Sequence, residues 1–131
     1  NIENIDGCDR VFQLWNLQDS LGKKELDTSL EITRSLLGNG TPFPRILVSL
    51  VYLYQQMLWK KMGQDKPVGF TGINKIITSN ISHYDRGYSH SELKHVMQEL
   101  RMLDVLCKST SLSDESLIHP LIVKICKSQY V

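Results

Sequence analysis

The chain has 131 residues, a length typical of one domain and sufficient to bury a sizeable core. Hydrophobic residues make up 41% and charged residues 22%, which excludes an intrinsically disordered chain. The net charge is +1, from 15 basic and 14 acidic residues, so the sequence lacks the strongly basic composition typical of a dedicated reader of duplex DNA.

Two amphipathic helices are predicted at the start of the chain, both with the 3.6-residue period. The first covers residues 9–21 and is followed by Gly22 as a stop signal. Its inward stripe comprises Val11, Leu14, Trp15 and Leu21. The second covers residues 23–37, and its inward positions are Leu26, Leu30, Thr33 and Leu37.

The third predicted helix has the clearest pattern. Pro42 and Pro44 mark its start, because proline is tolerated in the first helical turn, and Lys60 and Lys61 place cations at its carboxyl end. Its main apolar face comprises Phe43, Ile46, Leu47, Leu50, Tyr54, Met57 and Leu58. A second apolar row comprises Val48, Tyr52 and Trp59. A helix that is apolar on two sides is buried centrally or faces a partner; we favour central burial and keep a subunit interface as the alternative.

Three further helices follow a loop at residues 64–72, the only place where a linker would divide the chain. A short helix is predicted from Ile73 to Ile81, and a long one has the inward face Leu93, Val96, Met97, Leu100, Leu103, Leu106 and Cys107. The last carries Leu117, Leu121, Ile122 and Ile125, is capped by Ser113 or Ser116, and starts no more than a turn before Pro120 or bends there. The sequence thus predicts an all-α bundle of five to six helices, one domain over residues 1–131.

The stretch NISHYDRGYSHSEL, residues 80–93, gathers imidazoles and carboxylates in a pattern that invites the hypothesis of a site. An enzymatic hypothesis builds an acid–base site from His83, Asp85 and Glu92. A helical metal site is disfavoured, because His90 and His95 are five residues apart and therefore diverge by about 140° around a helix.

A structural interpretation uses more of the same residues. Ser89 and Glu92 have the S-x-x-E spacing of a capping box, in which each side chain accepts from the backbone amide of the other. Tyr88 and Leu93 occupy the two positions of a hydrophobic staple. We therefore predict that this stretch starts a helix.

Other chemical motifs are missing from the sequence. It has no phosphate-binding G-x-x-x-x-G-K-[ST] loop and no G-x-G-x-x-G, so we expect no cofactor, no metal, no catalytic residue and no small-molecule substrate. Asp104 and Lys108 are four residues apart, which predicts an ion pair along a helix.

Cysteine usage and hydropathy indicate where the protein works. Cys8, Cys107 and Cys126 form no C-x-x-C pair, which favours a reducing, cytoplasmic setting with Cys107 and Cys126 as small core residues. The longest apolar stretch, residues 46–58, is too short and too polar to span a bilayer.

The order of these segments resembles the C-terminal collar domain of the delta subunit of the bacterial DNA polymerase III clamp loader. The similar segments are VFQLWNLQDSLGKKELDTSLEITRSLLGNGTPFPRILVSLVYLYQQMLWKK, INKIITSNISHYDRGYSHSELKHVMQEL, LRMLDVLCKS and LIHPLIVKIC. The third resembles the L-x-x-x-D-x-x-L-K stretch of that family, with Asp104 and Lys108 at the matching positions. Together they cover the chain roughly from Val11 to Ile125.

The resemblance implies a non-catalytic oligomerisation domain that supports sliding-clamp loading in DNA replication. It implies gamma/tau and delta-prime subunits as partners of this domain, and contacts with the clamp and DNA through AAA+-like domains that precede it. The chain begins at Asn1 without a Met, so we expect a C-terminal fragment of a longer protein. The alternatives are the gamma/tau collar domain, or a helical nucleic-acid-binding module that uses Arg86, Lys94 and Arg101.

Overall fold

Six α-helices and no strands make up the part of the chain that the computed structural model describes, residues 11–65, 67 and 74–130. They are α1 (Leu14–Gly22), α2 (Leu26–Gly38), α3 (Phe43–Lys61), α4 (Lys75–Asp85), α5 (His90–Ser109) and α6 (Asp114–Cys126). The prediction of an all-α bundle of five to six helices is confirmed. None of the helices in these ranges is long and apolar enough to cross a membrane.

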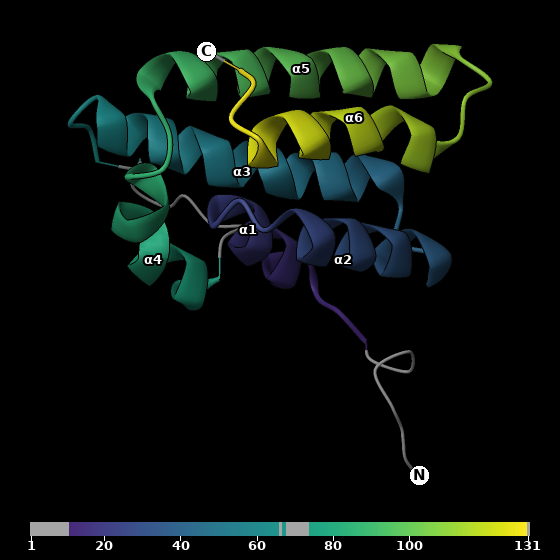
Figure 1. Ribbon diagram of the computed structural model, residues 1–131, viewed down its shortest axis with the longest axis horizontal. Helices are drawn as coiled ribbons and strands as arrows, with labels where there is room; N and C mark the ends of the chain where they lie inside the picture. The colour runs from purple at the N-terminus through teal and green to yellow at the C-terminus, as the bar shows by residue number, and fades with distance from the viewer. Residues whose placement is uncertain (1–10, 66, 68–73, 131) are drawn as a thin grey trace, which may run out of the picture.

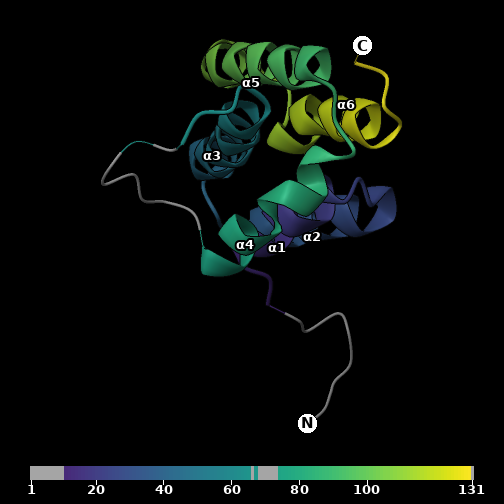
Figure 2. The same ribbon diagram turned by 90° about the vertical axis from the view of Figure 1, so that its left-hand side faces the viewer.

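Five of the helices close a ring around one core. α3 packs on α5, α5 on α6, α6 on α2, α2 on α1, and α1 on α3, while α4 covers one end against α1 and α3 (Figure 1). α2 and α5 run in one direction along the bundle, and α3 and α6 run in the other. The view along the bundle shows α3 and α5 on one side and α6 and α2 on the other (Figure 2).

A single apolar cluster fills the space inside this ring. Its fully buried side chains include Leu17, Leu21, Ile46, Leu50, Leu53, Tyr54, Met57, Ile77, Leu93, Leu100, Ile118 and Ile122. The predicted inner faces of α3 and α5 therefore point to the core, except that Leu58, Leu106 and Cys107 are only partly buried or exposed.

The first helix begins later than predicted. Gln13 is its N-cap in an extended conformation and forms a reciprocal pair with Asn16, so α1 starts at Leu14. Val11 consequently precedes the helix and is 72% exposed, and its predicted place on the inward stripe is wrong. Asp9 lies outside the described residues.

The second helix also begins later, because the turn before it needs a left-handed residue. Lys24 has a φ of 58°, which no residue of a right-handed helix adopts, and α2 starts at Leu26. The buried positions of α2 are Ser29, Ile32, Thr33 and Leu36. Of the predicted inward set, only Thr33 is fully buried, and the three leucines pack against the core while partly exposed.

Pro120 does not shorten the last helix. α6 starts at Asp114, more than one turn before Pro120, and continues through it, so the expected late start is wrong. Ser113 caps the helix by accepting from the Ser116 amide at 3.1 Å. Pro120 and Ser116 are both exposed, so the carbonyl that lacks a proline N–H lies on the solvent side, where water is available to it.

The loop and the short helix are described in part. Gln64 and Asp65 are not helical, and most of the predicted linker, like Ile73, lies outside the described residues. The predicted short helix is present as α4, with Ile77, Ile81 and Tyr84 buried.

Candidate interaction surface

The stretch that resembled a chemical site begins α5. Glu92 N–H donates to Ser89 Oγ at 3.0 Å, and Ser89 N–H donates to Glu92 Oε1 at 2.9 Å. The predicted capping box is thereby confirmed. Tyr88 and Leu93, at the two staple positions, are 3% and 0% exposed.

The second carboxylate oxygen of Glu92 has a partner that the sequence did not indicate. Lys24 Nζ donates to Glu92 Oε2 at 2.8 Å and to Ser128 Oγ at 2.7 Å, and lies 4.4 Å from the centroid of the Tyr88 ring. The Lys24 and Glu92 side chains are only 14% and 10% exposed. Lys24 therefore ties the α1–α2 turn to the start of α5 and to the residues that follow α6. We call these four residues the Lys24 junction.

Buried phenols extend this junction into the core. Tyr88 Oη donates to the carbonyl of Leu21 at 2.5 Å and is 2.9 Å from Tyr54 Oη, and the two rings meet edge to face at 5.5 Å. Burial raises the pKa of both tyrosines well above the usual value, with smaller contributions from neighbouring groups. Both phenols thus remain protonated hydrogen-bond donors at neutral pH, which suits a structural role.

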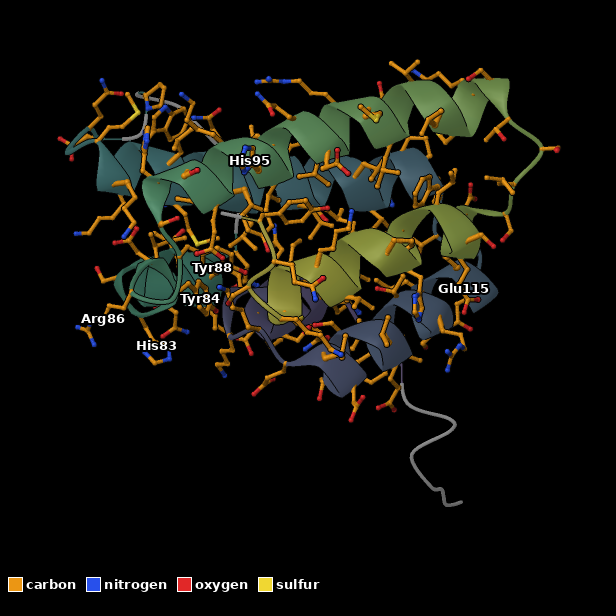
Figure 3. The ribbon with its side chains drawn as sticks, turned by 45° about the horizontal axis from the view of Figure 1, so that its top comes forward. His83, Tyr84, Arg86, Tyr88, His95 and Glu115 are labelled. Carbon is orange, nitrogen blue, oxygen red and sulfur yellow. The ribbon has the colours of Figure 1, made fainter. Side chains whose placement is uncertain are left out.

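The three groups of the enzymatic hypothesis do not converge. Glu92 is turned onto the Ser89 amide and Lys24, while Asp85 Oδ1 lies 3.5 Å from Lys61 Nζ. His83 is exposed at the end of α4 (Figure 3). No acid–base pair forms from these side chains.

The histidines of α4 and α5 are also apart. His90 is exposed at the first position of α5, whereas His95 lies further along α5 with its ring 6.5 Å from that of Tyr130. No group of three or more metal-ligating side chains occurs within residues 11–65, 67 and 74–130.

The two described cysteines are free and partly buried against the core. Burial raises the pKa of the Cys126 thiol to about 11, which keeps it protonated and unreactive at neutral pH. Cys8 lies outside the described residues.

A hollow with a largely apolar lining lies between α3 and α5. Its volume is about 520 Å³, and it is lined by Leu47, Val48, Val51 and Tyr52 from α3 and by Leu100, Arg101, Asp104 and Val105 from α5. We call it the α3–α5 groove. Val48 and Val105, which line the groove from α3 and α5, are 47% and 64% exposed.

Exposed apolar side chains continue along α5 beyond the groove. Met102 and Leu106 are 55% and 37% exposed, and Met102 neighbours Val105 and Leu106 on the helix surface at i+3 and i+4. Leu112, in the turn that follows α5, is 60% exposed. Val105, Met102 and Leu106 therefore form a contiguous apolar row on α5.

The three residues of the second apolar row of α3 line two different hollows. Val48 and Tyr52 line the groove, so the favoured interpretation of central burial is wrong for this part of α3. Trp59 is partly exposed and lines a different hollow, with Gln56 and Lys60. The sequence did not single out Val51 or Val105, because a valine outside the main apolar face of a helix gives no signal until its neighbours are placed.

A row of cations on α5 passes the groove, and its middle member, Arg101, is part of the groove lining. Lys94, Arg101 and Lys108 recur at seven-residue intervals, two helical turns apart, and all three are exposed. The predicted Asp104–Lys108 ion pair is confirmed at 3.4 Å, and because its side chains are 49% and 67% exposed it contributes only a few tenths of a kcal/mol. Arg86, which the nucleic-acid hypothesis grouped with Lys94 and Arg101, lies instead at the end of α4 (Figure 3).

Comparison of this chain with protein-family models, with curated proteins and with solved structures found no match.

Proposed function

We propose that this protein is a non-catalytic oligomerisation module, the collar domain of a clamp loader delta subunit. The observation that carries the proposal is the α3–α5 groove, whose lining is largely apolar and where Val48 of α3 and Val105 of α5 are exposed. An apolar surface with a polar rim is typical of a protein–protein interface. The order of the six helices resembles that of the delta collar, and this resemblance is why we propose the clamp loader as the assembly.

The proposed partners are the gamma/tau and delta-prime subunits, which would contact this domain directly. The sliding clamp and DNA would be bound by other domains of the same subunit, and the complex would work in the cytoplasm. In this role the buried polar groups of the Lys24 junction stabilise the fold and perform no chemistry.

Co-purification tests the proposal. The full-length subunit that contains this chain is expressed with the gamma/tau and delta-prime subunits of the same organism, and the complex is sized by light scattering. We expect one complex that contains all three proteins, and a monomeric or weakly associating species when the 131-residue chain is purified alone. Failure of the full-length subunit to join the complex would contradict the proposal. Replacement of the gamma/tau subunit by this protein would favour a gamma/tau collar instead.

A second candidate, a nucleic-acid-binding module, is favoured by one observation, the row of cations Lys94, Arg101 and Lys108 on α5. Phosphate contacts give affinities that fall steeply with salt. Fluorescence anisotropy with a labelled DNA duplex distinguishes the candidates, because only this one predicts salt-dependent binding that charge reversal at Arg101 weakens.

A further inference from the structure

The α3–α5 groove has the shape and lining of a binding site for a third helix. Leu47, Val51 and Leu100 form part of its floor, and Val48 and Val105 stand higher and more exposed. Two neighbouring helices that run in opposite directions leave a furrow between them, and an amphipathic helix fills such a furrow with apolar side chains at i, i+3, i+4 and i+7.

The charges around the groove indicate which charge should border the apolar face of that helix. Lys94 and Arg101 have no ion-pair partner among the described residues. Lys108 pairs with Asp104, which is the only carboxylate in the groove lining. The 19 residues of α3 include no Asp or Glu, and Arg45 is exposed near its start. The groove therefore has an excess of positive charge, although the chain as a whole is nearly neutral.

A second copy of this chain does not supply a matching helix within the described ranges. The exposed large apolar residues on its helices are Val48, Ile76, Met102, Val105 and Leu106. Those on α3 and α5 stand beside cations, and Ile76 follows Lys75 on α4, whose one carboxylate, Asp85, already pairs with Lys61. The exposed carboxylates Glu25, Asp27 and Glu31 lie at or on α2, which has no exposed large apolar residue.

Nucleic acid fits the groove less well than a helix does. The lining of the groove includes one cation, Arg101, and one aromatic side chain, Tyr52, and five of its eight residues are aliphatic. Single strands are held by stacking of successive bases on aromatic side chains, and duplexes are held by several contacts of cations with phosphates.

We propose that the α3–α5 groove binds an amphipathic helix of another protein, apolar on one face and flanked by carboxylates spaced about two turns apart. The inference rests on the proposed function, because it names the part of the partner subunit that the interface receives.

Synthetic helical peptides test whether the groove of the full 131-residue chain prefers a helix flanked by carboxylates. The probe is a peptide of about three heptads, with Leu at the core-facing positions and Glu at the flanking positions, and its counterpart has Lys in place of every Glu. Affinities are measured by anisotropy at about 50 mM and about 500 mM salt. The site is mapped by NMR amide shifts.

The expected result is binding of the Glu peptide at least about tenfold tighter than the Lys peptide at low salt, with shifts centred on Val51 and Val105. Arg101→Glu should remove that preference and Val105→Ser should weaken both peptides. The matched controls are Arg86→Glu and Val11→Ser, which make the same changes at exposed positions away from the groove, and both should leave the affinities unchanged.

Four outcomes would overturn the inference. They are equal affinities for the two peptides, tighter binding of the Lys peptide, shifts that map elsewhere, and displacement of the Glu peptide by a DNA duplex. A dimer in analytical ultracentrifugation that Val105→Ser dissociates would also overturn it, because the occupant would then be a second copy.

Co-purification with the same variants separates this inference from the proposed function. If the full-length subunit joins the clamp loader and Arg101→Glu and Val105→Ser join equally well, the clamp-loader assignment stands and the groove inference fails. If the full-length subunit does not join but the peptide results are as expected, the groove chemistry stands and the clamp-loader assignment fails.

Discussion

At the Lys24 junction, the side chains of Lys24 and Glu92 are largely buried and bound to each other, whereas at the α3–α5 groove Val48 and Val105 are exposed with Arg101 beside them. The residues that looked most like a chemical site are used internally: Glu92 caps α5 and pairs with Lys24. The groove holds no unusual residue type, yet it leaves apolar surface in water. Which side chains remain without an internal partner is thus a better guide to function here than which side chains are reactive.

The largest expected effect comes from breaking the junction. Glu92→Ala removes the carboxylate half of the capping box of α5, which accepts from the Ser89 amide, and leaves the ammonium of Lys24, only 14% exposed, without its carboxylate. We expect a loss of about 3 kcal/mol in the free energy of unfolding, measured by urea denaturation. Glu92→Gln keeps an oxygen acceptor for the Ser89 amide and should lose less.

The matched control for Glu92→Ala is Glu115→Ala. Glu115 lies at the start of α6 (Figure 3), in an exposed pair with Arg34 of α2 at 3.3 Å. The same truncation there should cost at most about 0.5 kcal/mol. Equal losses at the two positions would mean that the Lys24 junction contributes no more than a surface ion pair.

A second large effect is expected at the α1–α4 contact. Gly22 lies directly against the buried Tyr84 ring, and a Cβ added to Gly22 would lie 2.6 Å from Tyr84 Cγ and Cδ1. Gly22→Ala should therefore lower the free energy of unfolding by about 1–3 kcal/mol in the same urea assay. At Gly38, the last residue of α2, an added Cβ has no neighbour within 4 Å, so Gly38→Ala should be neutral or stabilising by up to about 1 kcal/mol. Effects of the same sign at both glycines would refute the packing explanation for Gly22.

Alkaline pH should lower the stability of the folded protein. The pKa values of Tyr54 and Tyr88 are raised by burial, and the pKa of Cys126 is raised from 9.0 to about 11. Above about pH 9 the unfolded chain therefore binds fewer protons than the folded chain, and the free energy of unfolding falls as pH rises through these values. The urea midpoint should be lower at about pH 10.5 than at about pH 8.

Replacing the titrating groups shows which of them cause the loss of stability at alkaline pH. Tyr88→Phe and Cys126→Ala should each reduce the difference between the two midpoints, whatever they do to the stability at about pH 8. An alkaline fall of the same size in both variants would assign it to other groups.

The smallest expected effect is at the groove. Val105→Ser changes a side chain that is 64% exposed and should alter the free energy of unfolding by no more than about 0.5 kcal/mol. Val96→Ser makes the same change on the same helix at a position that is 1% exposed, and should cost about 2–3 kcal/mol. A large loss for Val105→Ser would show that the groove belongs to the core rather than to an interface.

Local features of this protein followed from the sequence alone. The capping box of Ser89 and Glu92, the proline-led start of α3 and the Asp104–Lys108 pair each depend on atoms within four residues of one another. The inner faces of α3 and α5 were also predictable, because a long helix repeats its apolar period several times. The start of α1 was not, since a single exposed residue such as Val11 has the same chemistry as a buried one.

The tertiary structure decided everything that joins distant segments. Lys24 meets Glu92 and Ser128 only because the ring of helices brings the α1–α2 turn beside the start of α5 and the end of α6. Gly22, predicted only as a stop signal, is also a packing position because α4 places the Tyr84 ring on it. The α3–α5 groove exists because Val51 and Val105 come from helices far apart in the sequence, and the exposure of an apolar side chain depends on which helices cover it.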